Sequence, residues 1–189
     1  MNKHQQKTAT THAALVDAFC ELYAVRPIES ITIKEVVAIA GCNRTTFYQH
    51  FGSIYDVLDA VEQDALARIT ESMGSISVEV GHIEGFPGAF LALCKSNADL
   101  FALLLQGSGS HHFKARLQER IRPIVEANLA VAADGADHVP GYLADFYIAG
   151  VIAVVSSCIA ADDEAALEQA ARTIDGILRR GIIPTAMDG

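Results

Sequence analysis

Apolar residues recur at helical spacing along almost the whole chain, and this periodicity predicts an all-α protein. One such face, close to the N-terminus, consists of Leu15, Phe19, Leu22 and Tyr23. Period-two alternation is confined to residues 75–80, which glycines flank, so we interpret this segment as a linker rather than a strand. Pro27 ends the first predicted helix, because its ring disfavours helical geometry in the residue before it. Residues 1–10 are polar, and we expect them to be frayed and flexible.

Two short helices follow. Thr32 and Glu35 form a capping box, in which the side chain of each residue satisfies a free backbone N–H group of the other. The apolar face of this second helix closes at Gly41, since a residue without Cβ can take the left-handed conformation that the turn needs. Asn43 then caps a third helix, which extends to Phe51.

A long fourth helix begins after Gly52, with Ser53 and Asp56 at its cap, and fades near Gly74. Further helices are predicted at Phe86–Asn97, Leu100–Leu105, Phe113–Ala133 with a kink or restart at Pro123, Tyr142–Ala160 and Glu164–Arg180. The connecting loops, by composition, are Gln106–His112, Asp134–Gly141 and the break at Asp162–Asp163. We therefore expect a three-helix domain over residues 1–52 and a larger helical domain over residues 53–189.

The second and third predicted helices, joined by a tight glycine turn, form a helix-turn-helix pattern. Phe47 and Phe51 are four residues apart and face inward, which leaves Arg44, Thr45, Tyr48 and Gln49 on the outer side. An arginine can donate two hydrogen bonds to guanine O6 and N7, and a threonine can touch a thymine methyl group. Tyrosine, histidine and threonine side chains can donate to phosphate oxygens. An ordinary amphipathic surface helix is the alternative explanation of this pattern.

The segment Ile31–Glu62 resembles the N-terminal DNA-binding region of TetR-type transcriptional regulators. The parts that carry the resemblance are Thr32, Ile39–Gly41, Thr45–Phe51 and Val57–Val61, and the likeness covers roughly residues 8–65. The resemblance implies that Arg44 and Thr45 read bases, whereas Thr32, Thr46, Tyr48 and His50 hold phosphates. Asn43 places the positive end of the helix dipole toward DNA, and Gln49 lies on the same outer face.

The start of the fourth helix departs from the family pattern. Many family members have a lysine just after the position of Ser53, where it clamps the DNA backbone, and this chain has Ile54 there. Loss of that lysine removes one salt-sensitive phosphate contact. The neighbouring Tyr55 is a candidate neutral donor in its place, so it completes the set of predicted DNA contacts.

The segment Tyr142–Ala160 is apolar around nearly its full circumference, so it must be buried on both sides. A membrane span is the rival interpretation, because Asp145 is its one charged residue. Ser156, Ser157 and the absence of flanking basic residues argue against a span. The TetR resemblance instead implies dimerisation through the last two helices, with an interface formed by Tyr147, Val151, Val154, Val155, Ile159, Leu167, Ala171, Ile174 and Leu178.

The resemblance also implies a small-molecule pocket in the larger domain, although packing in the core is the commoner explanation for apolar residues at helical spacing. The candidate lining residues are Phe86, Phe90, Cys94, Phe101, Leu105, Phe113, Tyr142 and Phe146. His111 and His112 are adjacent and would point about 100° apart on a helix, which makes them a poor pair of metal ligands. We therefore favour a solvated loop end for these two residues. A nearby basic group forms either a solvated face or an anion site close to Pro123; its members are Lys114, Arg116, Arg120 and Arg122.

The composition and the motifs of the chain exclude several classes of function. The net charge of −9 over 189 residues argues against non-specific coating of nucleic acid, but residues 1–55 carry five basic and four acidic side chains. The four cysteines are far apart and form no Cys-x-x-Cys pair, so we expect reduced, mostly buried thiols in a cytoplasmic protein without a bound metal. No phosphate loop, nucleophile elbow, zinc-protease motif or dinucleotide fingerprint is present, so we expect neither an enzyme nor a cofactor.

Two hypotheses follow. In the first, the protein is a dimeric transcriptional regulator, a repressor that binds a palindromic double-stranded DNA operator and responds to an unidentified small molecule. In the second, it keeps the same fold but acts as a protein-binding or ligand-binding module with weak affinity for DNA. The net charge and the loss of the lysine at Ile54 are the features that favour the second.

Overall fold

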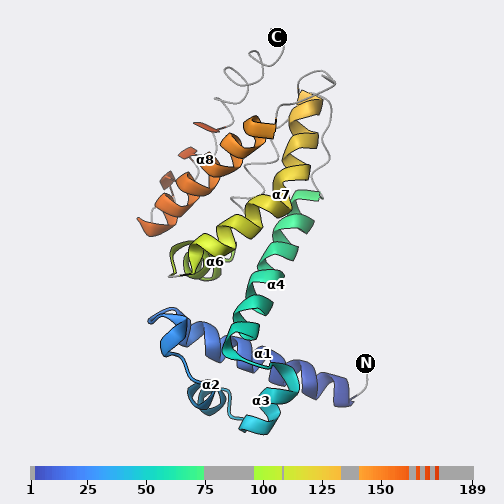
Figure 1. The fold of residues 1–189 in the computed structure, drawn as a ribbon, viewed down its shortest axis with the longest axis vertical. Helices are drawn as coiled ribbons and strands as arrows, with labels where there is room; N and C mark the ends of the chain where they lie inside the picture. The colour runs from blue at the N-terminus through green and yellow to red at the C-terminus, as the bar shows by residue number, and fades with distance from the viewer. Residues whose placement is uncertain are drawn as a thin grey trace. The chain divides into compact units, whose positions relative to one another are not determined.

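A computed structural model describes residues 3–74, 96–107, 109–132 and 141–161, together with six residues between 165 and 174. Within these ranges all regular elements are helical, as the sequence predicts: seven α-helices and one 3-10 helix (Figure 1). The chain divides into two compact units, Met1–Ala65 and Leu66–Gly189, which we describe separately. The first half of the fourth helix belongs with the first of these units, and the domain boundary between residues 52 and 53 stays a prediction.

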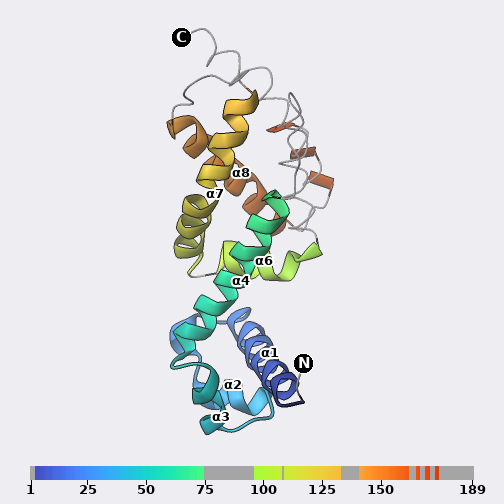
Figure 2. The ribbon, with the colours of Figure 1, turned by 90° about the vertical axis from the view of Figure 1, so that its right-hand side faces the viewer.

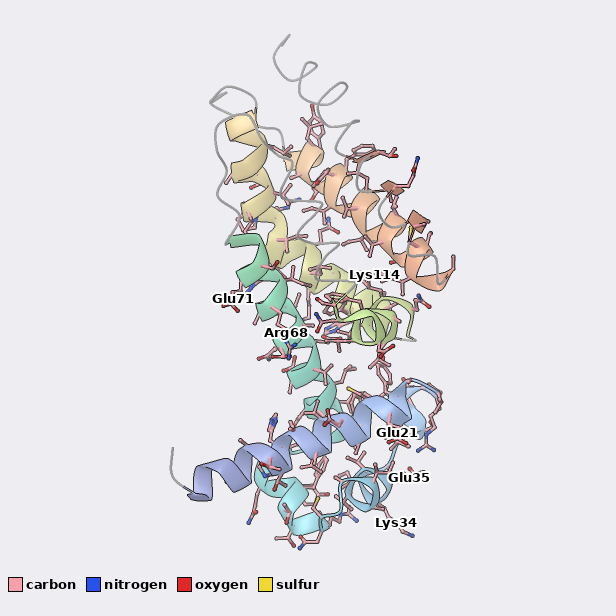
Figure 3. The ribbon with its side chains drawn as sticks, turned by 180° about the vertical axis from the view of Figure 1, so that it is seen from behind. Glu21, Lys34, Glu35, Arg68, Glu71 and Lys114 are labelled. Atoms are coloured by element: carbon pink, nitrogen blue, oxygen red, sulfur yellow. The ribbon has the colours of Figure 1, made fainter. Side chains whose placement is uncertain are left out.

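The first unit contains α1 (Lys3–Tyr23), the 3-10 helix η1 (Ile28–Ser30), α2 (Ile33–Ile39), α3 (Arg44–His50) and the first half of α4 (Ile54–Gly74). Helix α1 begins at Lys3, so residues 3–10 are helical where the sequence predicted a frayed segment. The fully buried apolar side chains of this unit are Leu15, Phe19, Val36, Phe47, Val57 and Ala65. Charged side chains such as Glu21 of α1 and Lys34 of α2 are exposed and lie outside this core (Figure 3).

The predicted end of α2 and the predicted start of α4 are confirmed in atomic detail. Gly41 has a φ of 65°, in the left-handed region, and the next residue, Cys42, donates its N–H to the Val37 carbonyl over 3.0 Å. That bond is the one that defines a Schellman ending. At the start of α4, the N–H of Asp56 donates to Ser53 Oγ over 3.2 Å, and the Asp56 carboxylate accepts in return from the N–H of Ser53 over 3.1 Å.

The second unit contains the remainder of α4 together with α6 (Ala98–Gln106), α7 (Ser110–Ala132) and α8 (Gly141–Ala160). Helices α6, α7 and α8 pack against one another, and α7 and α8 lie side by side in both views (Figures 1 and 2). Their shared core is apolar, and its most deeply buried members are Phe101, Leu105, Phe113, Leu117, Val125, Ala144, Ile148 and Val155.

Two loop and helix predictions change in this unit. Helix α7 already begins at Ser110, so His111 and His112 lie in its first turn rather than in a loop. The same helix continues through Pro123, which excludes the predicted restart and leaves the alternative of a kink. The predicted linker at 75–80, the helix at 86–95 and the loops at 134–140 and 162–163 lie outside the described residues.

A polar cluster joins α7 to α8. Asp145 Oδ2 accepts a hydrogen bond from Arg122 Nη2, and its Oδ1 accepts from Gln118 Nε2 over 3.2 Å. These two bonds, with the charge of Arg122, hold the pKa of Asp145 below its ordinary value of 3.8. Arg122 pairs with Asp145 while its side chain stays 42% exposed, which fits the predicted solvated face better than an anion site.

Candidate nucleic-acid interface

Helix α3 has one buried and one exposed face, as the sequence predicts. Phe47 is 0% exposed and Phe51 is 6% exposed, so both aromatic rings anchor the helix in the first unit. The outer face carries Arg44, Thr45, Tyr48 and Gln49, all exposed, with Thr46 and His50 half-buried at its edges. A short helix that follows a tight turn and presents such a row is the element that enters a DNA groove in helix-turn-helix domains.

Hydrogen bonds within the cap of α3 occupy two of the predicted contact residues. Asn43 Oδ1 accepts from the N–H of Thr46 over 2.8 Å and from the Thr46 hydroxyl over 3.1 Å. The Thr46 hydroxyl has only one proton, so it can donate to a phosphate only by leaving Asn43. The primary role of this pair in the free protein is therefore to start the helix.

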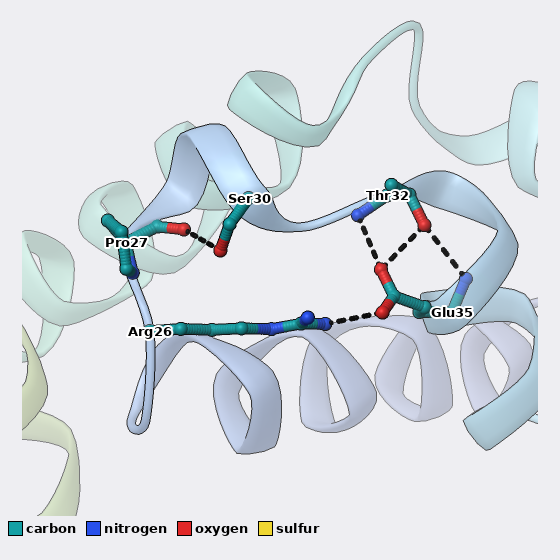
Figure 4. A network of polar contacts seen from close by, with 5 residues as sticks. All are labelled: Arg26, Pro27, Ser30, Thr32 and Glu35. Atoms are coloured by element: carbon teal, nitrogen blue, oxygen red, sulfur yellow. Dashed lines mark hydrogen bonds and ion pairs between the residues drawn. The ribbon is translucent and has the colours of Figure 1, made fainter.

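The cap of α2 engages Thr32 in the same way. The Thr32 hydroxyl donates to Glu35 Oε2 over 2.6 Å, and the Thr32 N–H donates to the same oxygen over 3.0 Å (Figure 4). Arg26, which sequence reasoning did not single out, pairs with the other oxygen of Glu35 over 2.9 Å. The Thr32 hydroxyl, followed by Arg26 and the Thr32 N–H, lowers the pKa of Glu35 from 4.5 to about 2.

Arg44 and Tyr48 contact each other on the exposed face. Arg44 Nη2 donates to the Tyr48 hydroxyl over 3.1 Å, and the guanidinium carbon lies 5.6 Å from the centre of the Tyr48 ring. The two residues are four apart in one helix, a spacing that brings side chains together. That spacing was visible in the sequence and would have indicated the contact.

His50 lies against the first helix. Its ring centre is 5.8 Å from that of His12 in an edge-on arrangement, and the His12 ring lies 4.8 Å from Phe51. His12 is exposed and His50 is half-buried. The end of α3 and the middle of α1 therefore form one continuous imidazole-bearing surface, and His12 joins the candidate interface as a residue that the sequence did not point to.

The start of α4 differs from the lysine clamp of the family pattern. Ile54 is 8% exposed, so the position where lysine is common has become part of the core. The Asp56 carboxylate accepts from the N–H of Gly52 over 2.9 Å and from the Ser53 hydroxyl over 2.9 Å, and it brings a negative charge to this end. Tyr55 is 59% exposed and is the accessible donor here.

Helix α8 presents a different outer face from the one that the sequence suggested. Tyr147, Val151 and Val155 are 5%, 8% and 1% exposed, so these predicted interface residues pack inside their own unit. Val154, Ile159 and Ile174 are half-buried, and Leu167, Ala171 and Leu178 lie outside the described residues. The exposed face of α8 consists of Tyr142, Phe146, Ala149, Gly150, Ala153, Ser157 and Ala160. Periodicity cannot distinguish the inner from the outer face of a helix that is apolar all round.

The residues predicted to line a ligand pocket do not lie together in the structure. Phe101, Leu105 and Phe113 are at most 1% exposed and belong to the core of the second unit. Tyr142 and Phe146 are 70% and 66% exposed, so they do not line the same enclosed space. Phe86, Phe90 and Cys94 lie outside the described residues.

Two other predictions concern metals and membranes. In the described part of the chain, no three histidine, cysteine or acidic side chains are grouped as metal ligands, and Cys20, Cys42 and Cys158 are free thiols. Cys20 and Cys42 are half-buried rather than buried.

Helix α8 is long and apolar enough to cross a membrane by length and composition, with a mean hydropathy of 2.0, but one side of it packs against α6 and α7.

Comparison with known proteins agrees with this geometry. Residues 15–61 match the family model of bacterial regulatory proteins of the tetR family, and this range contains α2, α3 and the start of α4. The whole fold resembles a TetR transcriptional regulator from Streptococcus agalactiae, with a TM-score of 0.72 at 19% identity over 94% of this chain and 98% of that one.

Two further solved structures share the fold. One is the fatty acid degradation regulator FadR from Bacillus halodurans, with a TM-score of 0.74 at 15% identity over 90% of this chain and 95% of that one. The other is the TetR family repressor AlkX from a Dietzia species, implicated in biodegradation of n-alkanes, with a TM-score of 0.51 at 19% identity over 92% of this chain and 97% of that one.

Proposed function

We propose that the chain, a DNA-binding transcriptional regulator of the non-enzymatic TetR family, acts in the cytoplasm as a dimeric repressor that binds a palindromic operator. In this proposal, a small molecule releases the repressor from the operator. The observation that carries the proposal is the division of α3 into an anchored and an exposed face. Phe47 and Phe51 fix the helix, and Arg44, Thr45, Tyr48 and Gln49 remain available to base edges and phosphates.

The exposed face of α8 supports the dimer. It combines two aromatic side chains, Tyr142 and Phe146, with a row of small residues that lets another helix approach closely. An apolar surface of this kind on a soluble protein is typical of a contact with another chain. A second copy of the chain also fits the operator, because two recognition helices can read two half-sites one helical turn apart.

The apolar core of the second unit supports an apolar effector. Phe101, Leu105 and Phe113, contributed by α6 and α7, carry no polar atoms in their side chains. Two of the compared regulators are named for fatty acid degradation and for biodegradation of n-alkanes. We therefore propose an effector with a long apolar part, which would shift the regulator by its different affinity for the DNA-bound and free states.

Selection from randomised DNA duplexes tests the function. The purified chain at low salt should enrich an inverted repeat, and Arg44→Ala should lose the preference at one base pair in each half-site. A selection that enriches no repeat contradicts the proposal. Release of the selected duplex by fatty acids or n-alkanes, measured by fluorescence anisotropy, tests the effector separately, since a panel without effect contradicts only that part.

A further inference from the structure

Arg44 and Tyr48 lie one helical turn apart on the exposed face of α3 and contact each other in two ways. The Nη2 group donates to the Tyr48 hydroxyl over 3.1 Å, and the guanidinium carbon lies 5.6 Å from the ring centre. Tyr48 is 50% exposed, so the pair forms at the protein surface and needs no DNA to assemble. The guanidinium is thus already held in one region of space when the protein is free.

Such a pair contributes little to folding, because water competes for both of its exposed partners. Its effect on a bound molecule differs. A free arginine side chain loses much rotamer freedom when it binds, and a partner that restricts the arginine beforehand reduces that loss. Arg44 is the longer and more flexible of the two residues, so it is the residue whose binding gains from the contact.

The contact between Arg44 and Tyr48 leaves enough hydrogen-bond donors free for both residues to bind DNA. A guanidinium has five N–H donors and Tyr48 takes one of them, so both terminal nitrogens of Arg44 can still reach guanine O6 and N7. The Tyr48 hydroxyl accepts from Arg44 and keeps its own proton for a phosphate oxygen. Donation to a charged phosphate would polarise the hydroxyl oxygen and strengthen its bond with Arg44.

We propose that Arg44 and Tyr48 act as one recognition unit, in which Tyr48 positions the Arg44 guanidinium against a guanine edge and thereby contributes to base discrimination. This inference rests on the proposed function, because it concerns how the regulator reads its operator. It differs from a backbone contact by Tyr48 alone, since a phosphate contact strengthens binding to every sequence alike.

Tyr48→Phe tests the inference, because it removes the acceptor and keeps the aromatic ring. The selected duplex is compared with a duplex in which the base pair whose preference Arg44→Ala loses has been replaced. Wild-type affinity should fall on the second duplex, and the ratio of the two affinities should be about five-fold smaller in Tyr48→Phe. In the Arg44→Ala background, Tyr48→Phe should leave the ratio unchanged.

Tyr55→Phe is the matched control. Tyr55 is 59% exposed in the same unit and stands at the predicted backbone contact, so loss of its hydroxyl should weaken both duplexes equally and preserve the ratio. Circular dichroism of each variant checks that the fold is retained.

The possible failures are distinguishable. If Tyr48→Phe weakens both duplexes by one common factor, Tyr48 grips only the backbone and the recognition unit is contradicted. If Tyr48→Phe reduces the ratio equally with and without Arg44, the two residues act independently and the proposal also fails. If the wild-type protein selects no sequence at all, the proposed function itself is overturned.

Discussion

Arg26 Nη2 lies 2.9 Å from Glu35 Oε1, so a residue that follows α1 is fixed to the acid that caps α2. Glu35 thereby serves two partners, because its other oxygen accepts from both the hydroxyl and the N–H of Thr32 (Figure 4). A carboxylate with three donors favours its ionised form. The link between Arg26 and the cap of α2 therefore depends on the charge of one side chain.

This dependence predicts a loss of stability in acid. The pKa of Glu35 is lowered from 4.5 to about 2, so its contribution is complete above the unfolded value and disappears as the pH falls through the folded value. The wild-type protein should therefore lose thermal stability between about pH 5 and pH 2 more steeply than Glu35→Gln, which cannot titrate. Thermal unfolding followed by circular dichroism at several pH values measures the difference. Equal slopes for the two proteins would contradict the assigned network.

Gly41 should resist replacement by alanine for a backbone reason alone. Its φ is 65°, and a Cβ built at this position would meet nothing within 4 Å. Gly41→Ala should cost about 1 kcal/mol, because a non-glycine residue is strained in the left-handed region. Gly41→Asn should cost less, since asparagine tolerates this conformation. Urea unfolding gives both values, and a neutral alanine variant would rule out the positive φ.

Ile54→Lys should lower the stability of the first unit and strengthen its binding to DNA. The side chain is 8% exposed, so replacing isoleucine should destabilise the first unit by about 1–3 kcal/mol, although a lysine stem can direct its ammonium outward. One added phosphate contact should steepen the dependence of log affinity on log salt by about 0.9 for each bound subunit. Ala115→Lys, at an exposed position of α7, adds the same charge in the second unit and should leave the slope nearly unchanged. Anisotropy titrations over a range of salt concentrations provide the slopes.

Ala153→Glu should separate the proposed dimer. Ala153 lies on the exposed face of α8, and a charge there would be desolvated between two copies of the chain. We expect a monomer that is still helical and that binds the inverted repeat more weakly. Ala115→Glu introduces the same side chain on the exposed side of α7 and should stay dimeric. Light scattering after size-exclusion chromatography distinguishes the two; a dimeric Ala153→Glu protein would place the interface elsewhere.

Local rules were sufficient for the first unit. The caps at Thr32, Asn43 and Ser53, the glycine ending at Gly41 and the inward direction of Phe47 all depend on residues within five positions of each other. Because helix ends and helix faces are set by such short-range contacts, the sequence alone could define them.

Contacts between distant residues could not be predicted in this way. The pairing of Arg26 with Glu35 depends on the path of the chain around η1, and the pairing of Arg122 with Asp145 depends on how α7 and α8 pack. The inner face of α8 was misassigned for the same reason, since Tyr147 and Phe146 are neighbouring aromatic residues and only packing buries the first.

Asp145 has a consequence for the uniqueness of the fold. An apolar cylinder among apolar neighbours can rotate or slide between settings of similar energy, whereas one carboxylate that must meet Arg122 and Gln118 admits a single rotation and depth. Asp145→Leu could therefore leave the protein folded and yet give doubled or broadened methyl resonances from α8 in NMR spectra. In an otherwise uncharged helix, one carboxylate therefore fixes the rotation of α8 and, with it, the set of side chains that the helix exposes.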